Sequence, residues 1–174
     1  FMLVTLNDVM MLAEQQGIAI GAFNTPNLES LRAAIESAEE LERPVIVQHC
    51  QMHEELIPLD IIGPIMLDHA ARASVPVCVH LDHGEDLDYL KRALDMGFTS
   101  VMYDGSVHPY EENLATTKRA VELAEKYGIN VFTMTGFLDG INDSLKVQNP
   151  IETMDENTTV SLCFDKELLY KNMV

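Results

Sequence analysis

The sequence has few basic residues, few cysteines and no long apolar run. Lysine and arginine together number 11 against 28 aspartates and glutamates, for a formal net charge of −17 at pH 7. Such an acidic chain argues against nucleic acid or an anionic lipid surface as the main partner. The three cysteines, Cys50, Cys78 and Cys163, form no paired spacing. They therefore indicate neither a disulfide framework nor a zinc ribbon, and a reducing, cytoplasmic setting is favoured.

Other missing features narrow the class of protein further. No apolar run approaches the ~20 residues of a membrane helix, so we expect no membrane partner. The N-terminus has no basic segment followed by a sustained apolar one, so we expect no secretory signal. Neither a Gly-x-Gly-x-x-Gly nor a Walker motif supports nucleotide binding. With 174 residues, 47% of them apolar, the chain can bury the core of one domain.

What the chain does contain is an alternation of short apolar runs with helical patterns. One βαβ unit takes roughly 30 residues, and the runs recur at about that interval. This repeat predicts an α/β protein with a parallel sheet, and an extra helix is expected before the first strand, at residues 5–16. The five expected strands occupy residues 18–23, 45–47, 77–81, 101–103 and 129–132.

The intervening segments carry helix signals. Thr25 followed by Pro26 predicts an N-cap and a first helical residue. Residues 52–74 are predicted to be helical, but broken at Pro58 and Pro64.

Functional residues of a parallel α/β sheet collect at the carboxyl ends of its strands. The third run ends in His80-Leu81-Asp82-His83-Gly84, where alternation puts His80 and Asp82 on one side of the strand. A histidine beside a carboxylate suits a metal ligand next to a general acid–base, although such a cluster can also merely cap the next helix. No lysine ends a strand, which disfavours a Schiff-base mechanism.

The segment PVCVHLDHG, residues 76–84, resembles the first signature of the class II, metal-dependent ketose-bisphosphate aldolases. This family includes the fructose- and tagatose-bisphosphate aldolases. Residues 21–24, 44–48 and 102–106 also resemble the family, in its order and spacing, so that the resemblance covers residues 3–131. It implies an α/β fold made of the first five βα units of a TIM (β/α)₈ barrel, with an unassigned C-terminal tail.

The resemblance also implies an activity and a set of site residues. The activity is the zinc-assisted, reversible aldol cleavage of fructose or tagatose 1,6-bisphosphate to dihydroxyacetone phosphate and glyceraldehyde 3-phosphate, an aldehyde-lyase reaction of glycolysis and carbohydrate metabolism. Asp82 resembles the catalytic acid–base, and His83 resembles a zinc ligand. Asp104 matches an acidic position that helps some members hold a second, buried metal. Asn24 matches a substrate-contacting residue, and Cys50 stands where some relatives have a phosphate-binding serine.

The sequence departs from the family in its last part. A barrel of this kind takes ~250 residues. The family's later Glu-x-Glu segment, its two further zinc-binding histidines and its phosphate loops have no counterparts, and Phe132 and Met134 stand where acids are expected. We therefore assign residues 1–135 to the N-terminal part of a class II aldolase-like TIM barrel and residues 136–174 to a divergent tail, and we expect the chain to be incomplete.

Two other interpretations of the sequence stay open. One is a noncatalytic half-barrel fragment or assembly module without a complete zinc site, and the other is a flavodoxin-like domain with a five-stranded sheet. A half-barrel leaves strand edges and apolar helix faces uncovered, so we expect self-association into homo-oligomers. His49 and His53 have the spacing of a helical metal pair, but solvated or capping roles near a strand end are favoured.

Overall fold

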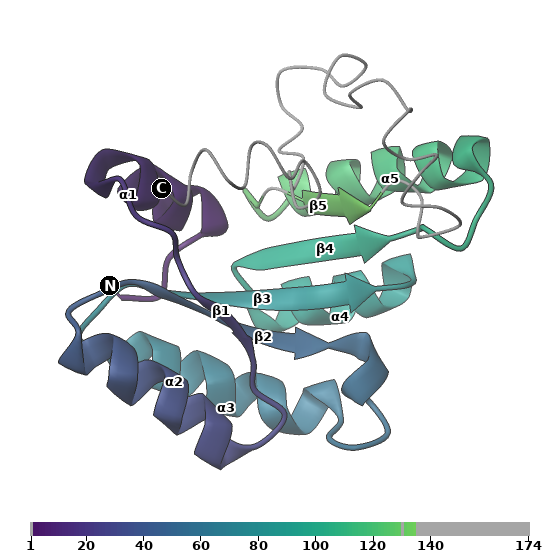
Figure 1. The fold of residues 1–174 in the computed structure, drawn as a ribbon. Helices are drawn as coiled ribbons and strands as arrows, with labels where there is room; N and C mark the ends of the chain where they lie inside the picture. Colours follow the sequence, from purple (N-terminus) through teal and green to yellow (C-terminus); the bar gives the residue numbers. More distant parts are fainter. Residues whose placement is uncertain (1, 130, 135–174) are drawn as a thin grey trace, which may run out of the picture.

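Five parallel strands form a single sheet in which the order in space is the order in the chain, β1-β2-β3-β4-β5 (Figure 1). The computed structural model describes residues 2–129 and 131–134. A flavodoxin-like sheet reverses its strand order after the first strand, so this consecutive row excludes that alternative and is the row of a (β/α)₈ barrel. The strands are β1 (Ala22–Asn24), β2 (Val45–Cys50), β3 (Val77–Gly84), β4 (Ser100–Asp104) and β5 (Val131–Met134).

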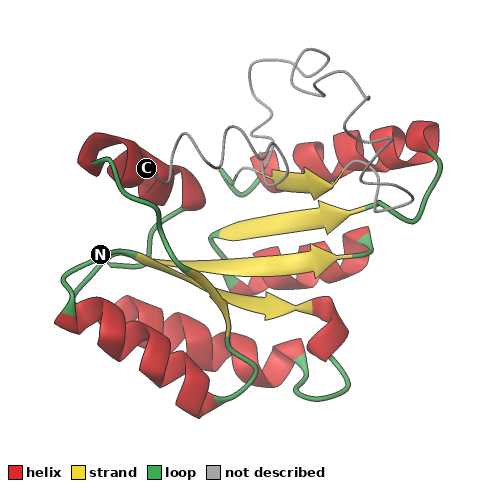
Figure 2. Ribbon diagram, viewed as in Figure 1, coloured by secondary structure: helices red, strands yellow, loops and turns green. Residues whose placement is uncertain are grey.

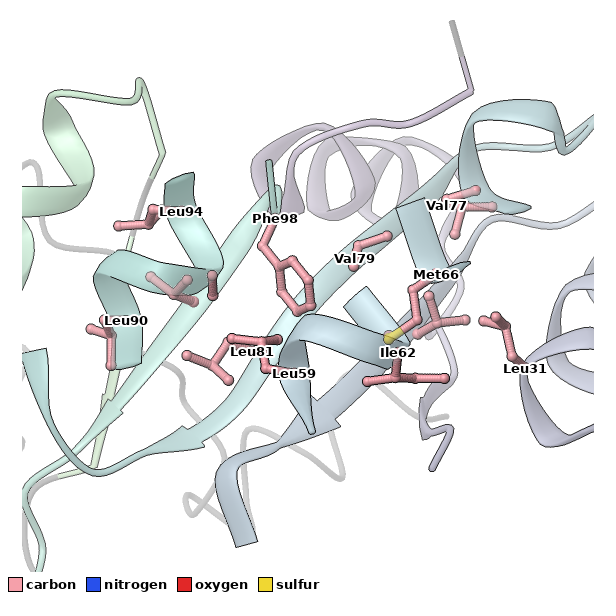
Figure 3. Packing of buried hydrophobic residues seen from close by; sticks show 14 of the residues in the cluster. Leu31, Leu59, Ile62, Met66, Val77, Val79, Leu81, Leu90, Leu94 and Phe98 are labelled. Carbon is pink, nitrogen blue, oxygen red and sulfur yellow. The ribbon is translucent and has the colours of Figure 1, made fainter. Parts of the chain in front are cut away.

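A helix follows each of the first four strands (Figure 2). The apolar side chains of the strands and of these helices form one buried core. Figure 3 shows this core, in which Val79 and Leu81 of β3 lie with Leu59 and Met66 from the helix that precedes this strand. The helices are α2 (Leu28–Glu40), α3 (Leu59–Arg72), α4 (Leu87–Met96) and α5 (Tyr110–Glu125), with a short 3₁₀ helix, η1 (Gln51–His53), between β2 and α3. Among the described helices, none is both long and apolar enough to cross a membrane.

The extra N-terminal helix, α1 (Leu6–Gln16), packs against the opposite face of the sheet, beside the first residues of β2 and β3. Leu6 and Val9 of this helix pack against Ile46 of β2 and Cys78 of β3. Because side chains alternate along a strand, these even-numbered positions face away from the layer of α2–α5. In a barrel this is the inner face, so α1 covers part of the barrel interior.

Two of the predicted helix boundaries are wrong. The N-cap of α2 is Asn27, whose Oδ1 accepts the Ser30 N–H at 2.8 Å. Thr25 is instead buried, and its N–H donates to the Gln48 carbonyl. α3 begins after Pro58, as predicted, but it continues unbroken through Pro64. The buried face of this helix packs into the core, and tertiary packing overrides the local penalty of a proline.

Gly84, at the end of β3, leaves no room for a side chain. A Cβ at this position would lie 2.8 Å from the Met102 carbonyl oxygen and would also collide with the Leu90 side chain. We expect Gly84→Ala to lower the free energy of unfolding by about 1–3 kcal/mol, because the backbone must shift. Gly21→Ala is the matched control, since a Cβ there meets only the exposed ring of Phe23, which can turn aside. Equal denaturation midpoints for the two variants would contradict this reading of the packing.

Candidate active site

The carboxyl ends of β1, β3 and β4 bring together four polar side chains that the sequence singled out. Asn24 Nδ2 donates to Asp82 Oδ2 at 3.0 Å, although the two residues are 58 positions apart in the chain. His83 lies between two carboxylates: its Nδ1 is 2.6 Å from Asp104 Oδ2, and its Nε2 is 3.9 Å from Asp82 Oδ1. Asn24, Asp82, His83 and Asp104 thus share one edge of the sheet, which we call the carboxyl rim.

Cys50 lies at the same rim, at the end of β2 and opposite Asp82 in the strand register. Its side chain is buried. Burial raises the pKa of the Cys50 thiol, and the charge of Asp82 raises it further. The thiol is therefore held neutral and is not an activated nucleophile. Cys50 lies beside the four polar residues as a small, weakly polar side chain.

An unusual backbone conformation presents His83 to the rim. His83 has a φ of 47°, in the left-handed region that residues with a side chain rarely occupy. The register between β3 and β4 also shifts between Leu81 and Gly84. Irregularities of this kind re-aim a side chain at the end of a strand. Here His83 breaks the alternation of β3, so that both Asp82 and His83 reach the rim.

Asp104 orients the imidazole of His83. Burial disfavours the charged form of Asp104, but hydrogen bonds from Ser106 and His83 outweigh it and hold the pKa of the carboxyl below its ordinary value. An ionised Asp104 accepts the His83 Nδ1–H, which leaves the lone pair of His83 on Nε2. Metal-ligating histidines commonly have this arrangement, with one ring nitrogen held by a carboxylate and the other turned to the metal.

The donor set of the rim fits part of a zinc site. His83 Nε2 is suited to one ligand position, whereas catalytic zinc generally takes three protein ligands. Within residues 2–129 and 131–134, no group of three or more histidines, cysteines or acids is placed to hold a metal ion. Among the described residues, His83 is therefore a single candidate ligand.

His80 lies on the same side of β3 as Asp82, two residues before it and therefore below the rim. Its side chain is buried. Its Nδ1 is 2.7 Å from the Ser100 Oγ, and burial lowers the pKa of His80 to about 4. His80 is therefore neutral at physiological pH. The resemblance assigned no role to this residue, and its hydrogen bond ties β3 to β4 just beneath Asp82.

His49 is buried, not solvated as the sequence favoured. Only 1% of its surface is exposed. Its Nε2–H donates to Tyr89 Oη at 2.9 Å, and Tyr89 in turn donates to Glu54 Oε2 at 2.5 Å. Arg92 completes the group, since it pairs with Glu54 at 3.2 Å and lies 4.9 Å above the Tyr89 ring. This network faces the helix layer, where it joins the β2–α3 connection to α4.

Burial lowers the pKa of His49 to about 4, against an ordinary value of 6.5. As pH falls through this interval the unfolded chain takes up a proton that the folded chain does not, so folding stability is lost by up to about 1.4 kcal/mol per pH unit. In the unfolding equilibrium of His49→Gln, we expect about one proton fewer to be taken up than in the parent chain. The buried His80 and the carboxyl groups with a lowered pKa, such as that of Asp104, contribute to the dependence that remains. Unfolding free energies measured from pH 7 to 4.5 test this.

The matched control for this experiment is His108→Gln, because His108 is an exposed histidine next to Glu112. The change in the slope of stability against pH should be larger in His49→Gln than in this variant, because His49 is the one of these two histidines that folding removes from water. An unchanged slope in His49→Gln would show that the His49 network does not carry the acid sensitivity.

A consecutive row of parallel strands, with a carboxylate, an imidazole and an amide gathered at the carboxyl ends, defines part of a (β/α)₈-barrel enzyme. The chain belongs to the class II fructose-bisphosphate aldolase family, whose sequence profile matches residues 4–161. This membership confirms the resemblance drawn from residues 76–84. The division of the chain near residue 136 remains a prediction, because residues 135–174 lie outside the described part.

Individual relatives agree with the family profile. The chain is 36% identical over 154 residues to the probable fructose-bisphosphate aldolase of Bacillus subtilis, a match that covers 86% of this chain and 53% of the relative. It is 35% identical over 147 residues to the fructose-bisphosphate aldolase of Helicobacter pylori, covering 84% of this chain and 48% of the relative. The chain thus spans about half the length of the curated relatives it matches.

The fold matches solved structures over a similar extent. The YdjI aldolase from Escherichia coli K12 superposes with a TM-score of 0.73 at 32% sequence identity, over 78% of this chain and 52% of that one. A fructose-bisphosphate aldolase from Campylobacter jejuni superposes with a TM-score of 0.62 at 26% identity, over 79% of this chain and 47% of that one. The described strands therefore correspond to about half of an aldolase barrel.

Proposed function

We propose that this chain is the N-terminal part of an enzyme that reversibly cleaves fructose or tagatose 1,6-bisphosphate to dihydroxyacetone phosphate and glyceraldehyde 3-phosphate. The observation that carries the proposal is the gathering of Asn24, Asp82, His83 and Asp104 at the carboxyl rim. Membership of the class II fructose-bisphosphate aldolase family supports it. The complete activity belongs to a longer chain, since this one spans about half of its relatives.

In this proposal Asp82 moves the proton on the aldehyde side of the scissile bond. Asn24 holds one carboxylate oxygen, Oδ2, through a 3.0 Å hydrogen bond. The other oxygen, Oδ1, lies at 3.9 Å from His83 Nε2 and is the atom that accepts and returns the substrate proton. A carboxylate fixed at one oxygen is oriented before the substrate arrives, which is what efficient general acid–base catalysis requires.

We further propose that His83 is a zinc ligand through Nε2 and that Asp104 fixes its ring. When bound, zinc supplies Lewis-acid polarisation of the substrate carbonyl. The contact between His83 Nδ1 and Asp104 supports this role, because a ring that donates from Nδ1 keeps the lone pair of Nε2 for a metal. The proposal also keeps Asp104 as a candidate ligand for a second, buried metal, and it assigns the remaining zinc ligands to the part of the barrel beyond the described residues.

Substrate contacts are proposed for Asn24 and Cys50. Both are the last residues of strands whose carboxyl ends meet at the rim. The amide of Asn24 can donate to a sugar hydroxyl as well as to Asp82. Cys50 occupies the position of a phosphate-binding serine in the resemblance, with a thiol that donates only weakly. The partner is accordingly a phosphorylated sugar, and we propose a cytoplasmic, homo-oligomeric enzyme of carbohydrate metabolism.

The proposal is tested with a longer chain that carries the rest of the barrel. Fructose 1,6-bisphosphate and tagatose 1,6-bisphosphate are each tested as substrates. Cleavage is monitored through a coupled reaction that reduces the released dihydroxyacetone phosphate. We expect one of the two sugars to be cleaved, the activity to be lost on chelation and zinc to restore it. A folded, zinc-loaded longer chain that cleaves neither sugar would overturn the proposed function.

A further inference from the structure

We propose that Gln51, a residue that neither the sequence patterns nor the resemblance singled out, is a positioning residue that sets the orientation of His83. The inference rests on the proposed function, because it gives His83 its role as a ligand. Gln51 begins η1, directly after Cys50 at the end of β2. Its side chain reaches across to the loop that leaves β3, which begins two residues after His83.

Both ends of the Gln51 amide are bound to that loop. Its Oε1 accepts the Glu85 N–H at 2.7 Å, and its Nε2 donates to Asp86 Oδ2 at 3.0 Å. These partners are 34 and 35 positions away along the chain. An amide is the side chain that can satisfy a backbone donor and a carboxylate acceptor at once. Gln51 therefore joins the end of β2 to the β3–α4 connection through two hydrogen bonds, which we call the Gln51 clip.

The connection that Gln51 holds is short and carries strain. Only Glu85 and Asp86 separate the end of β3 from the first residue of α4. The left-handed φ of 47° at His83 is disfavoured for a residue with a side chain, so it persists only where the surrounding structure holds it. Gly84 cannot shift freely, because it is packed against the Met102 carbonyl. The Glu85 N–H is then the next point at which the chain can be fixed, and Gln51 binds it.

The second partner of Gln51 is itself fixed. Asp86 is the N-cap of α4, and its Oδ1 accepts the Tyr89 N–H at 2.7 Å. Gln51 uses the other carboxylate oxygen, so one aspartate joins the helix start to the end of β2. On the far side of η1, Glu54 accepts from Tyr89 Oη and from the Leu59 N–H. Gln51 thus projects from a segment that is tied to α4 at a second place.

The hydrogen bonds of Gln51 are exposed, unlike those of the His49–Tyr89 pair. Exposed hydrogen bonds add little to global stability, because water can bind the same groups in the folded chain when the bond is lost. Their effect is local: they select one conformation of the loop. Loss of the Gln51 clip should therefore let His83 leave its contact with Asp104 while the fold persists.

The decisive variant is Gln51→Glu in the longer, zinc-binding chain. It keeps the size of the side chain and the acceptor for the Glu85 N–H, but it sets a carboxylate against Asp86. We expect zinc affinity to fall by about 10-fold, as for other residues that orient a metal ligand. We also expect kcat to fall with little change in KM, and the downfield NMR resonance of the His83 Nδ1–H to shift or broaden.

A second variant distinguishes positioning from mere damage. In the double variant Gln51→Glu with Asp86→Asn, the new amide can donate to the new carboxylate, and asparagine still caps α4. Zinc affinity should return to within about threefold of the parent value, and the His83 resonance should return to its parent position. Such a rescue shows that residues 51 and 86 act through their contact with each other. Met52→Ala, at the neighbouring exposed residue of η1, should change neither quantity.

Two results would overturn the inference: an unaltered His83 resonance and zinc affinity in Gln51→Glu, or a loss that the double variant does not restore. The NMR resonance is read without substrate. If the longer chain cleaves neither sugar, the proposed function fails, but the resonance still decides whether Gln51 sets the His83 ring.

Discussion

Asp82→Asn, introduced into a longer chain that carries the rest of the barrel, should lower kcat by about 10²- to 10⁴-fold. The substitution keeps the size of the side chain and an oxygen that can accept from Asn24 Nδ2, which binds Asp82 at 3.0 Å. It removes only the capacity to take up and return a proton. Asp82→Ala should lose at least as much turnover, and in addition it leaves the Asn24 amide without its acceptor.

Steady-state kinetics and a melting curve together test the role of Asp82. The fold should be intact in both variants, because Asp82 lies at the rim rather than in the apolar core. Asp88→Asn is the matched control: Asp88 is an exposed carboxylate in the first turn of α4, away from the rim contacts. Undiminished turnover in Asp82→Asn would remove the acid–base assignment, while a parallel loss in Asp88→Asn would attribute the effect to charge alone.

The second large effect concerns zinc. The 174-residue chain should bind zinc weakly and show no useful aldolase turnover, whereas the longer chain should have both properties. The physical reason is that His83 is one ligand where about three are needed. Residues that act as a unit also lose their catalytic effect together when one of them is missing. Equilibrium dialysis against zinc, followed by the cleavage assay, compares the two chains.

Within the longer chain, His83→Ala should remove the metal and reduce activity to background. His69→Ala is a suitable control, since His69 lies on α3 and its Nδ1 contacts the Ile65 carbonyl, far from the rim in the fold. Tight zinc binding and robust cleavage by the 174-residue chain would show that residues outside the described part complete the site. Weak zinc binding by the longer chain as well would contradict the assignment of His83 as a zinc ligand.

Local patterns predicted much of the framework. The apolar runs around residues 45–47, 77–81 and 101–103 lie in β2, β3 and β4, because buried parallel strands are continuously apolar. The helix before the first strand is α1, whose capping box joins Thr5 and Asp8. Strand-end position was also informative for Asp82 and His83, since a parallel sheet collects its polar residues at the carboxyl ends.

Other features needed contacts between distant segments. No local signal separates a barrel from a flavodoxin-like sheet, because strand order depends on how the units pack. Pro64 remains inside α3 because packing outweighs its penalty, and His49 is buried because Tyr89, 40 residues later, faces it. Each of these outcomes is a tertiary effect, so sequence patterns that are local by nature missed it.

By itself, then, the sequence determined the alternation of strands and helices, the family, and the presence of Asp82 and His83 at the end of one strand. The tertiary structure decided the geometry: the reach of Asn24 to Asp82, the left-handed backbone that turns His83 toward Asp104, and the clip that Gln51 makes to the same loop. The reason is that periodicity and end signals act over a few residues. Hydrogen bonds across the rim join segments 21 to 58 residues apart, whose approach only the packed sheet sets.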